Sequence, residues 1–281
     1  MDIGIIGLGL MGGSIAYALK EKHRIFAYDT NNDSLDYALS SGVIDQICFS
    51  LPVLFKKTNV FFVCLYPSAV IQFYRDYCHQ FPKGSLLIDI SGVKKSLIEE
   101  LTSIIDDRVD FVFTHPLAGS EKSGVENASA NLFRNQNLII TPTEKNKKHN
   151  LELVASLGEE VGFDKITFLS AEEHDELIAF TSQLTHVVSL ALMDCAPKKN
   201  DIVSYIGDSF RELTRIAMIN EALWVDLFIR NAKFLNEKID DFINSLNKYK
   251  LAIDSCDETA LKEMMRSAKT ARIAIERGLK E

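Results

Sequence analysis

The last third of the chain is almost free of proline and glycine. No proline follows Pro197, and only two of the 14 glycines, Gly207 and Gly278, lie beyond that position. Tight turns between strands depend on these two residue types, so their scarcity argues against a strand-rich C-terminal part. The first 162 residues, in contrast, contain 12 glycines. The contrast predicts two domains, an α/β domain over residues 1–165 and an all-α domain over residues 166–281.

Basic residues are also scarce relative to acidic ones. The chain has 31 Lys and Arg against 39 Asp and Glu, which gives a net charge of −8. Nucleic acids and anionic membranes select proteins with basic surfaces, so neither is expected as a partner. The five cysteines form no CxxC pair, and the six histidines form no HxxxH pair. We therefore expect neither a disulfide framework nor a metal site.

Long hydrophobic runs are missing as well. No run approaches the ~18 apolar residues of a membrane span, and no apolar leader precedes the first predicted strand, which begins at Asp2. Free thiols are typical of a reducing compartment. The sequence therefore predicts a cytoplasmic protein, and a hydrophobic content of 47% is ample for a packed core.

The front half of the chain alternates short apolar runs with amphipathic segments. The runs predict buried parallel strands at residues 3–7, 24–29, 60–65, 85–90, 109–114, 137–141 and 165–170. Strands that alternate with helices are typical of a doubly wound, Rossmann-type sheet. From residue 171 onward the pattern is helical. Residues 220–250 predict one long helix with too many apolar positions for a one-sided surface helix, so part of it is expected to pack against another subunit.

A glycine-rich turn follows the first predicted strand and opens a helix. It has the spacing GxGxxG, and its residues are Gly7, Leu8, Gly9, Leu10, Met11 and Gly12. The first glycine permits a tight turn, the second lets a pyrophosphate approach the backbone, and the third brings helix and strand together. The free N–H groups at the start of the helix then attract phosphates. The turn therefore predicts a dinucleotide-binding site.

An acidic residue stands where such a site needs one. Asp29 ends the second predicted strand, where its carboxylate would accept hydrogen bonds from ribose hydroxyls and repel a 2′-phosphate. Residues 30–32 supply no arginine for that phosphate, so the sequence predicts NAD rather than NADP. Pro67, just after the predicted strand at 60–65, is assigned to the same site. Two alternatives stay open: the glycines only make a tight turn, or the chain is an NAD-binding regulator without turnover.

Two further segments follow predicted strands, where ligands of open α/β sheets bind. They are DISGVKK at residues 89–95 and THPLAGSEKSG at residues 114–124. The helical part adds SQLTH at 182–186 and SFRELTRIA at 209–217. Together with the glycine turn, these motifs make the chain resemble the prephenate and arogenate dehydrogenase family over about residues 2–250.

The resemblance implies an activity in tyrosine biosynthesis. In that family, NAD takes hydride from C4 of a cyclohexadiene ring while the ring carboxylate leaves as CO2. The product is 4-hydroxyphenylpyruvate from prephenate or tyrosine from arogenate. His115 matches the histidine that accepts the hydroxyl proton, a role that suits a neutral imidazole. Arg215 matches the arginine that binds a carboxylate through two parallel hydrogen bonds.

Four more positions match residues that lie at the substrate in the family. One of them is a tryptophan that reaches toward the neighbouring subunit of a homodimer formed through the helical domain. The four positions are His186, Ser120, Arg211 and Trp224.

The chain departs from the family at three places, one of which is Gln183, where the family often has a histidine. The family usually has Gly-Ser-Val-Lys after the fourth strand, with a serine that bonds the substrate hydroxyl and the catalytic histidine, whereas this chain has Ser91 and then Gly92. Ser91 stays a catalytic candidate, one position upstream. Asp208 resembles an acid of arogenate-using plant members, and a carboxylate there would attract the ammonium group that distinguishes arogenate from prephenate. The alternative is that Asp208 caps the following helix.

Plainer interpretations compete with these roles. His115 could satisfy backbone groups at a strand end, Arg215 could pair with Glu212 on one helix, and Trp224 could be a core residue. His174 is expected to be a solvated helix residue beside acidic neighbours. The competing enzyme is a β-hydroxyacid dehydrogenase, which has a similar glycine turn and a helical second domain but uses a lysine as acid and base.

Overall fold

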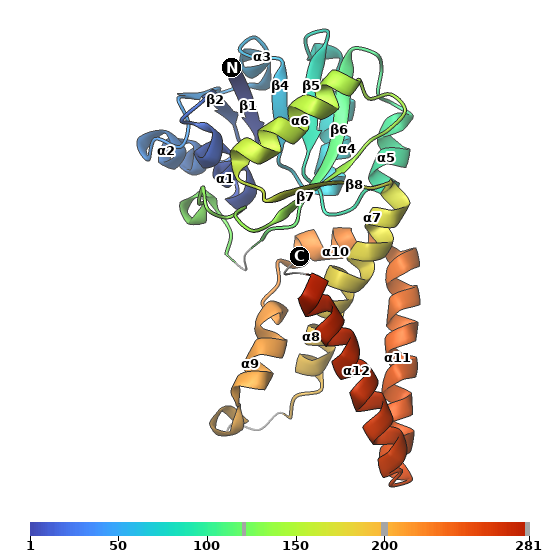
Figure 1. The fold of residues 1–281 in the computed structure, drawn as a ribbon. Helices are drawn as coiled ribbons and strands as arrows, with labels where there is room; N and C mark the ends of the chain where they lie inside the picture. The colour runs from blue at the N-terminus through green and yellow to red at the C-terminus, as the bar shows by residue number, and fades with distance from the viewer. Residues whose placement is uncertain (120–121, 198–201, 279–281) are drawn as a thin grey trace. The chain divides into compact units, whose positions relative to one another are not determined.

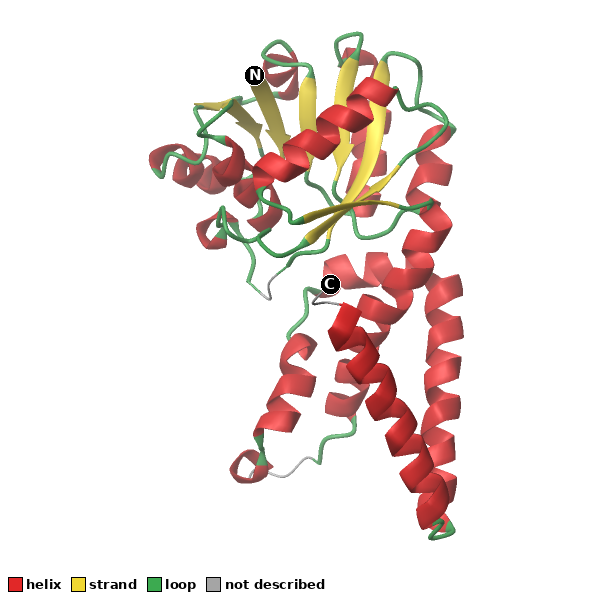
Figure 2. Ribbon diagram, in the orientation of Figure 1, coloured by secondary structure: helices red, strands yellow, loops and turns green. Residues whose placement is uncertain are grey.

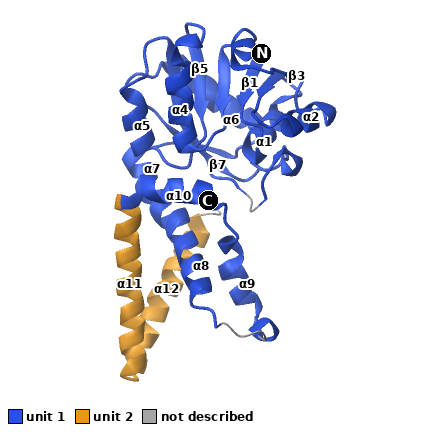
Figure 3. Ribbon diagram, turned by 180° about the vertical axis from the view of Figure 1, so that it is seen from behind, with its two compact units in different colours: residues 1–232 blue, residues 233–281 orange. Residues whose placement is uncertain are grey.

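The computed structural model describes residues 1–119, 122–197 and 202–278 (Figure 1). The chain forms two compact units, residues 1–232 and residues 233–281 (Figure 3). The first unit holds the whole sheet and the helices as far as Arg230. The division at residue 165 follows a different criterion, the change from strands to helices, and stays a prediction.

One eight-stranded sheet forms the centre of the first unit. Its strand order is β3-β2-β1-β4-β5-β6-β7-β8. The strands are β1 Asp2–Ile6, β2 Arg24–Tyr28, β3 Gln46–Ile47, β4 Val60–Val63, β5 Ser85–Asp89, β6 Val109–Pro116, β7 Asn137–Thr141 and β8 Lys165–Phe168. All seven predicted strands are present, and the Rossmann-type fold is confirmed. The additional strand β3 has only two residues, too few to show a sequence pattern.

The sheet is parallel except at one pair of strands. β6 and β7 run antiparallel, with His115 opposite Ile139. The prediction of parallel strands throughout is wrong at this pair. Parallel neighbours need a crossover, usually a helix, and the described part of this connection holds only the 3-10 helix Val125–Asn127. β6 also extends beyond the predicted strand, so His115 lies within a paired strand and not after it.

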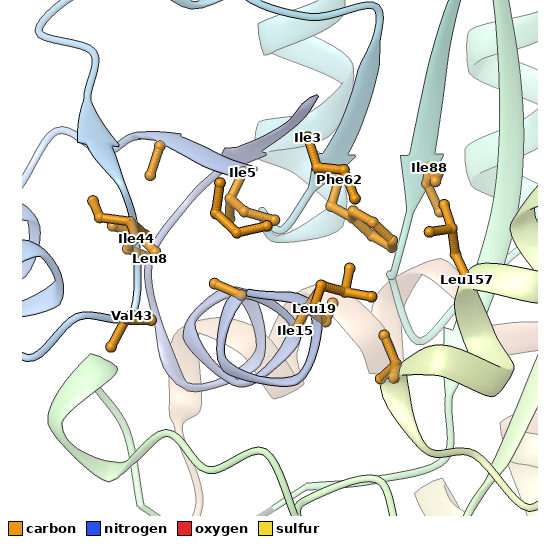
Figure 4. Close-up of a cluster of buried hydrophobic side chains, with 14 of the residues drawn as sticks. Ile3, Ile5, Leu8, Ile15, Leu19, Val43, Ile44, Phe62, Ile88 and Leu157 are labelled. Atoms are coloured by element: carbon orange, nitrogen blue, oxygen red, sulfur yellow. The ribbon is translucent and has the colours of Figure 1, made fainter. Parts of the chain in front are cut away.

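Helices cover both faces of the sheet (Figure 2). They are α1 Leu10–Leu19, α2 Asn32–Ser40, α3 Leu51–Phe55, α4 Pro67–Tyr77, α5 Lys95–Thr102 and α6 Lys148–Val161. One buried cluster joins the sheet to α1, α2 and α6, and a second joins it to α3, α4 and α5. Successive strand residues point to opposite faces, so Phe62 enters the first cluster while Phe61 and Val63 enter the second. Figure 4 shows the first cluster, in which Ile15 and Leu19 of α1 lie beneath the strands.

Helices alone follow the sheet. In the first unit they are α7 Ala171–Ile178, a π-helical segment Ala179–Gln183, α8 Leu184–Asp194, α9 Asp208–Thr214 and α10 Glu221–Arg230, with 3-10 turns at Ile202–Tyr205 and Arg215–Ala217. The second unit is a hairpin of α11 Ala232–Asp254 and α12 Glu258–Gly278 (Figure 3). The prediction of an all-α part after the sheet is therefore confirmed.

The prediction of a single long helix over residues 220–250 is wrong, because two helices, α10 and α11, cover this range. The chain leaves helical geometry at Asn231, with φ −112° and ψ 22°. The Asn231 side chain is buried and donates to the carbonyl oxygen of Asp175 (2.9 Å) and to Oε1 of Gln183 (2.7 Å). A buried asparagine with partners on α7 and the π-helical segment thus fixes the break between α10 and α11.

One helical stretch of the described residues, Ala171–Asp194, is long and apolar enough to cross a membrane by length and composition alone. It also buries four polar residues, of which His174, Asp175 and Gln183 are hydrogen-bonded within the protein and Ser189 is not. Polar groups with internal partners are typical of a core helix of a folded domain.

Candidate functional site

The glycine-rich turn is shaped as its sequence requires. Gly7 has φ +95°, and a Cβ there would lie 2.5 Å from the carbonyl oxygen of Cys64. A Cβ on Gly12 would lie 2.0 Å from the Gly7 carbonyl oxygen, so only glycine lets α1 approach the strand this closely. A Cβ on Gly9, in contrast, would meet no atom within 4 Å. The backbone at Gly9 is therefore open to a large group, and α1 starts there without a side-chain cap.

Asp29 is held beside this turn. Its Oδ2 accepts a hydrogen bond from the Leu8 backbone N–H (2.5 Å), and its Oδ1 accepts one from the Asn31 N–H (2.8 Å). The residue is half-buried at the end of β2, so its carboxylate remains accessible next to an open backbone. The remaining turn residues, Leu10 and Met11, are half-buried on the first turn of α1. Pro67 starts α4 at the same end of the neighbouring strand β4.

His115 is hydrogen-bonded to a second histidine. Its Nδ1 lies 2.8 Å from Nε2 of His174 on α7, and Nδ1 of His174 lies 2.7 Å from Oδ1 of Asp175. The Asp175 carboxylate also accepts hydrogen bonds from the backbone N–H groups of Lys94 and Lys95, both 2.8 Å, at the start of α5. His174 and Asp175 are 0% and 1% exposed, so this chain of hydrogen bonds is dry.

The acceptors in this chain assign its protons. A carboxylate only accepts, so Nδ1 of His174 carries a hydrogen and its Nε2 has a lone pair. That lone pair accepts from Nδ1–H of His115, which leaves a lone pair on Nε2 of His115. Gly92 lies on this side of the ring, since a Cβ built on it would be 3.5 Å from Nε2. His115 is thus a neutral base whose free nitrogen faces a position without a side chain.

Electrostatics keep His115 neutral. Burial of its ring holds the pKa of His115 well below its ordinary value of 6.5, and positive charge on His174, when that residue is protonated, or on Lys94 lowers it further. Burial also lowers the pKa of His174, although the hydrogen bond to Asp175 opposes this. Because both shifts favour the uncharged imidazole, His115 is ready to accept a proton at neutral pH.

A buried ion pair supports the loop that carries Gly92. The Nζ of Lys94 lies 2.5 Å from Oδ2 of Asp89 and donates to the Ser91 carbonyl oxygen at 2.6 Å. The Ser91 hydroxyl donates to Oδ1 of Asp89 (2.5 Å). Both charged side chains are 0% exposed. In this structure Ser91 therefore supports the loop, and Gly92 occupies the position opposite His115.

The helical part of the first unit holds the other predicted substrate residues. His186 on α8 and Trp224 on α10 stack with ring centroids 3.6 Å apart. Nδ1 of His186 donates to the Ser182 carbonyl oxygen (2.9 Å), and burial, with a smaller effect of Arg215, lowers the pKa of His186. Arg215 and Arg211 line a cavity of about 920 Å³ whose other walls are largely apolar.

Asp208 is not among the residues that line this cavity. Asp208 is the first residue of α9, is 91% exposed and accepts a hydrogen bond from Arg211 at 2.9 Å. The helix itself is capped at Gly207, so the alternative role of Asp208 as the N-cap residue is wrong. Ser120 lies outside the described residues.

The expectation that His174 is solvated is wrong. Along α7 the buried residues are His174, Asp175 and Ile178, which is helical spacing, and a capping box between Ser170 and Glu173 marks the start of the helix. The cap and the spacing could have placed His174 on the inner face. The charged residues beside His174 in the sequence hid that signal. His174 and Asp175 are polar, and their partners, His115 and Lys94, reach them only in the folded protein.

Comparisons with known proteins give a consistent result. Two family models match, "Prephenate dehydrogenase, nucleotide-binding domain" over residues 15–166 and "Prephenate dehydrogenase, dimerization domain" over residues 170–267. The cyclohexadienyl dehydrogenase of Zymomonas mobilis is 30% identical over 97% of this chain and 95% of its own length.

Solved structures agree with these matches. The prephenate dehydrogenase of A. aeolicus, crystallised with hydroxyphenyl propionate and NAD+, has a TM-score of 0.88 and 31% identity, with 98% of each chain covered. The arogenate dehydrogenase of Synechocystis has a TM-score of 0.82 at 24% identity over 98% of this chain and 100% of its own, which shows the shared fold.

The buried ion pair should dominate the stability of the site loop. Replacing Lys94 with Met leaves the Asp89 carboxylate buried without its counter-charge, so we expect the free energy of unfolding to fall by about 3–5 kcal/mol in urea titrations. The control is Lys95→Met, which removes a pair between exposed side chains, Lys95 and Glu172, and should lower the free energy of unfolding far less. Equal losses in the two variants would contradict this account of the loop.

Proposed function

This chain belongs to the prephenate dehydrogenase family, and we propose that it catalyses the NAD-dependent oxidative decarboxylation of prephenate to 4-hydroxyphenylpyruvate, with His115 as the base. The observation that carries the role of His115 is the free lone pair on its Nε2, which follows from the hydrogen bonds through His174 to Asp175. A base held neutral at physiological pH is what the hydroxyl proton of the substrate requires.

The residues of the glycine turn fit NAD. The open backbone at Gly9 and the uncapped start of α1 suit the pyrophosphate, and Asp29 suits the adenosine ribose. When bound there, NAD supplies the hydride acceptor for the reaction. The residues that we assign to this site are Gly7, Leu8, Gly9, Leu10, Met11, Gly12, Asp29 and Pro67.

Proton transfer is the step that falls to the protein. As hydride leaves C4, positive charge develops on the carbon that bears the hydroxyl group. Nε2 of His115 accepts the hydroxyl proton, which relieves this charge, and the bond to the ring carboxylate breaks so that its electron pair completes the aromatic ring. The proton then returns from His115 to the phenolic oxygen, and CO2 leaves. The protein otherwise has to position the ring and exclude water.

We assign the carboxylates of the substrate to the arginine-lined cavity. Arg215 offers two parallel donors to a carboxylate, and the largely apolar walls suit a carbon ring. His186 and Trp224 are proposed to contact the side chain of the substrate, and Arg211 and Ser120 are assigned to the substrate site from the same motifs. These roles come from the family motifs, and the stacking of His186 on Trp224 supports them.

A homodimer fits the helical part of the chain. The match to a dimerization domain covers residues 170–267, and large apolar side chains in that range are strongly exposed, among them Val203 (73%), Tyr205 (80%) and Ile229 (72%). Exposed apolar surface of this kind marks a contact with a partner. All five cysteines are free, which fits a cytoplasmic enzyme.

The alternative enzyme, a β-hydroxyacid dehydrogenase, needs a lysine as acid and base. The buried lysine near His115 is Lys94, and its ammonium group is bound to Asp89 and to the Ser91 carbonyl oxygen. Those bonds commit Lys94 to the loop. His115 therefore fits the proton-transfer role better.

His115→Asn should remove most of the catalytic activity. The amide cannot accept a proton, so we expect kcat to fall by about 10²–10⁴-fold while NAD binding, measured by calorimetry, stays unchanged. NADH absorbance with prephenate measures the rate. A wild-type kcat in the variant would show that His115 is not the base.

Arogenate is proposed as a second substrate, with Asp208 as the partner of its ammonium group. We expect Asp208→Asn to lower the ratio of kcat/KM for arogenate to that for prephenate about two- to five-fold, the contribution of one exposed ion pair. Glu159→Gln, at an exposed acid on α6 that does not line the cavity, is the control. A ratio that stays at the wild-type value in Asp208→Asn would refute the assignment.

A further inference from the structure

His115 is held from the side opposite its free nitrogen. We propose that His174 and Asp175 are positioning residues that fix the tautomer of His115 and take up the positive charge when it accepts the substrate proton. The inference rests on the proposed function, because it concerns the step in which His115 acts as the base. No sequence motif pointed to either residue.

Asp175, at the far end of this series of hydrogen bonds, is held in a fixed orientation. The Asp175 carboxylate receives three hydrogen bonds, from Nδ1–H of His174 and from the backbone N–H groups of Lys94 and Lys95. Two of these donors are backbone N–H groups at the start of helix α5, so the carboxylate cannot turn away without losing its hydrogen bonds to them. His174 lies between this anchor and His115, fully buried, with its ring inclined by 64° to that of His115.

The missing side chain at Gly92 makes this rear support important. A hydroxyl group at position 92 would lie next to Nε2 of His115, because a Cβ there is 3.5 Å from that atom. Gly92 offers no such group, and the Ser91 hydroxyl is bound to Asp89. The hydrogen bond to His174 is therefore the side-chain contact that holds the His115 ring in one orientation.

Two proton transfers along the hydrogen bonds account for every proton. The substrate hydroxyl proton moves to Nε2 of His115, and the proton on Nδ1 of His115 moves to Nε2 of His174. His174 then carries two hydrogens, one directed to His115 and one to Asp175, and His115 is neutral again. No heavy-atom bond changes and no electron is transferred. The reverse movement returns the proton to the phenolic oxygen.

This movement places the positive charge beside a carboxylate. After the second transfer the charge lies on His174, whose Nδ1 is 2.7 Å from Asp175, one ring further from the electron-poor carbon of the substrate. The other charged groups nearby are Lys94 and Asp89, which form a pair with each other. Asp175 is thus the carboxylate whose charge directly balances a protonated His174.

The test compares His174→Gln with His149→Gln, an exposed histidine on α6. A glutamine amide oxygen can accept from Nδ1–H of His115 but cannot carry a proton. We expect kcat to fall at least 10-fold with KM values for prephenate and NAD within two-fold of wild type, and the acid limb of the pH profile of kcat to move to lower pH. His149→Gln should match wild type in all three.

The direction of the pH shift separates charge uptake from simple repulsion. If His174 only repelled charge on His115, its removal would make His115 more basic and move the acid limb to higher pH. That shift, or a wild-type kcat in His174→Gln, would overturn the proposal. Loss of activity in His115→Asn tests the base itself, so the proposed function can survive while the role of His174 fails.

The tautomer can be read in the unmodified enzyme, independently of how any variant folds. In protein labelled with 15N-histidine, we expect NMR spectra near pH 7 to show His115 and His174 both with the hydrogen on Nδ1. Comparison with the spectrum of His115→Asn assigns the signals of His115. A hydrogen on Nε2 of His115 would overturn the proposal.

Discussion

The carboxylate of Asp175 connects the elements that form the site. It accepts the first backbone N–H groups of α5 and the Nδ1–H of His174, and through His174 it orients His115 in β6. The carbonyl oxygen of the same residue accepts from Asn231, where α10 gives way to α11. One buried acid on α7 therefore ties the sheet to the helices that follow it. A charge in such a dry place is tolerated because several hydrogen bonds satisfy it.

The second buried acid, Asp89, has a complementary task. With Lys94 and Ser91 it holds the loop after β5, so that Gly92 lies beside the free nitrogen of His115. Thr114, the neighbour of His115 in β6, donates to the carbonyl oxygen of Asp89 at 2.6 Å. The two strands β5 and β6 are thereby fixed to each other at the place where the chemistry occurs. Stability and reactivity depend here on the same few bonds.

Sequence patterns predicted the strands and the glycine turn well, because each depends on local physics. A buried parallel strand needs a continuous apolar run, and the turn needs glycine where a Cβ would collide with a carbonyl oxygen. The motifs likewise pointed to His115 and Arg215. The direction of β7 was predicted wrongly, since an apolar run has no polarity, and the described part of the β6–β7 connection holds only a 3-10 helix.

By itself, the sequence determined the Rossmann-type sheet, the helical part after it, the glycine turn and the family. Each of these depends on a local feature of the sequence: the spacing of apolar residues, the position of glycines or a short motif. Only the tertiary structure decided which face of α7 is buried, where the helix predicted over 220–250 breaks, and that His174 lies against His115. These outcomes depend on pairs far apart in the chain, such as Asp175 with Lys94 and Asn231 with Gln183. A polar residue on an inner face becomes favourable only when its hydrogen-bond partner arrives from another element, and no local pattern records that partner.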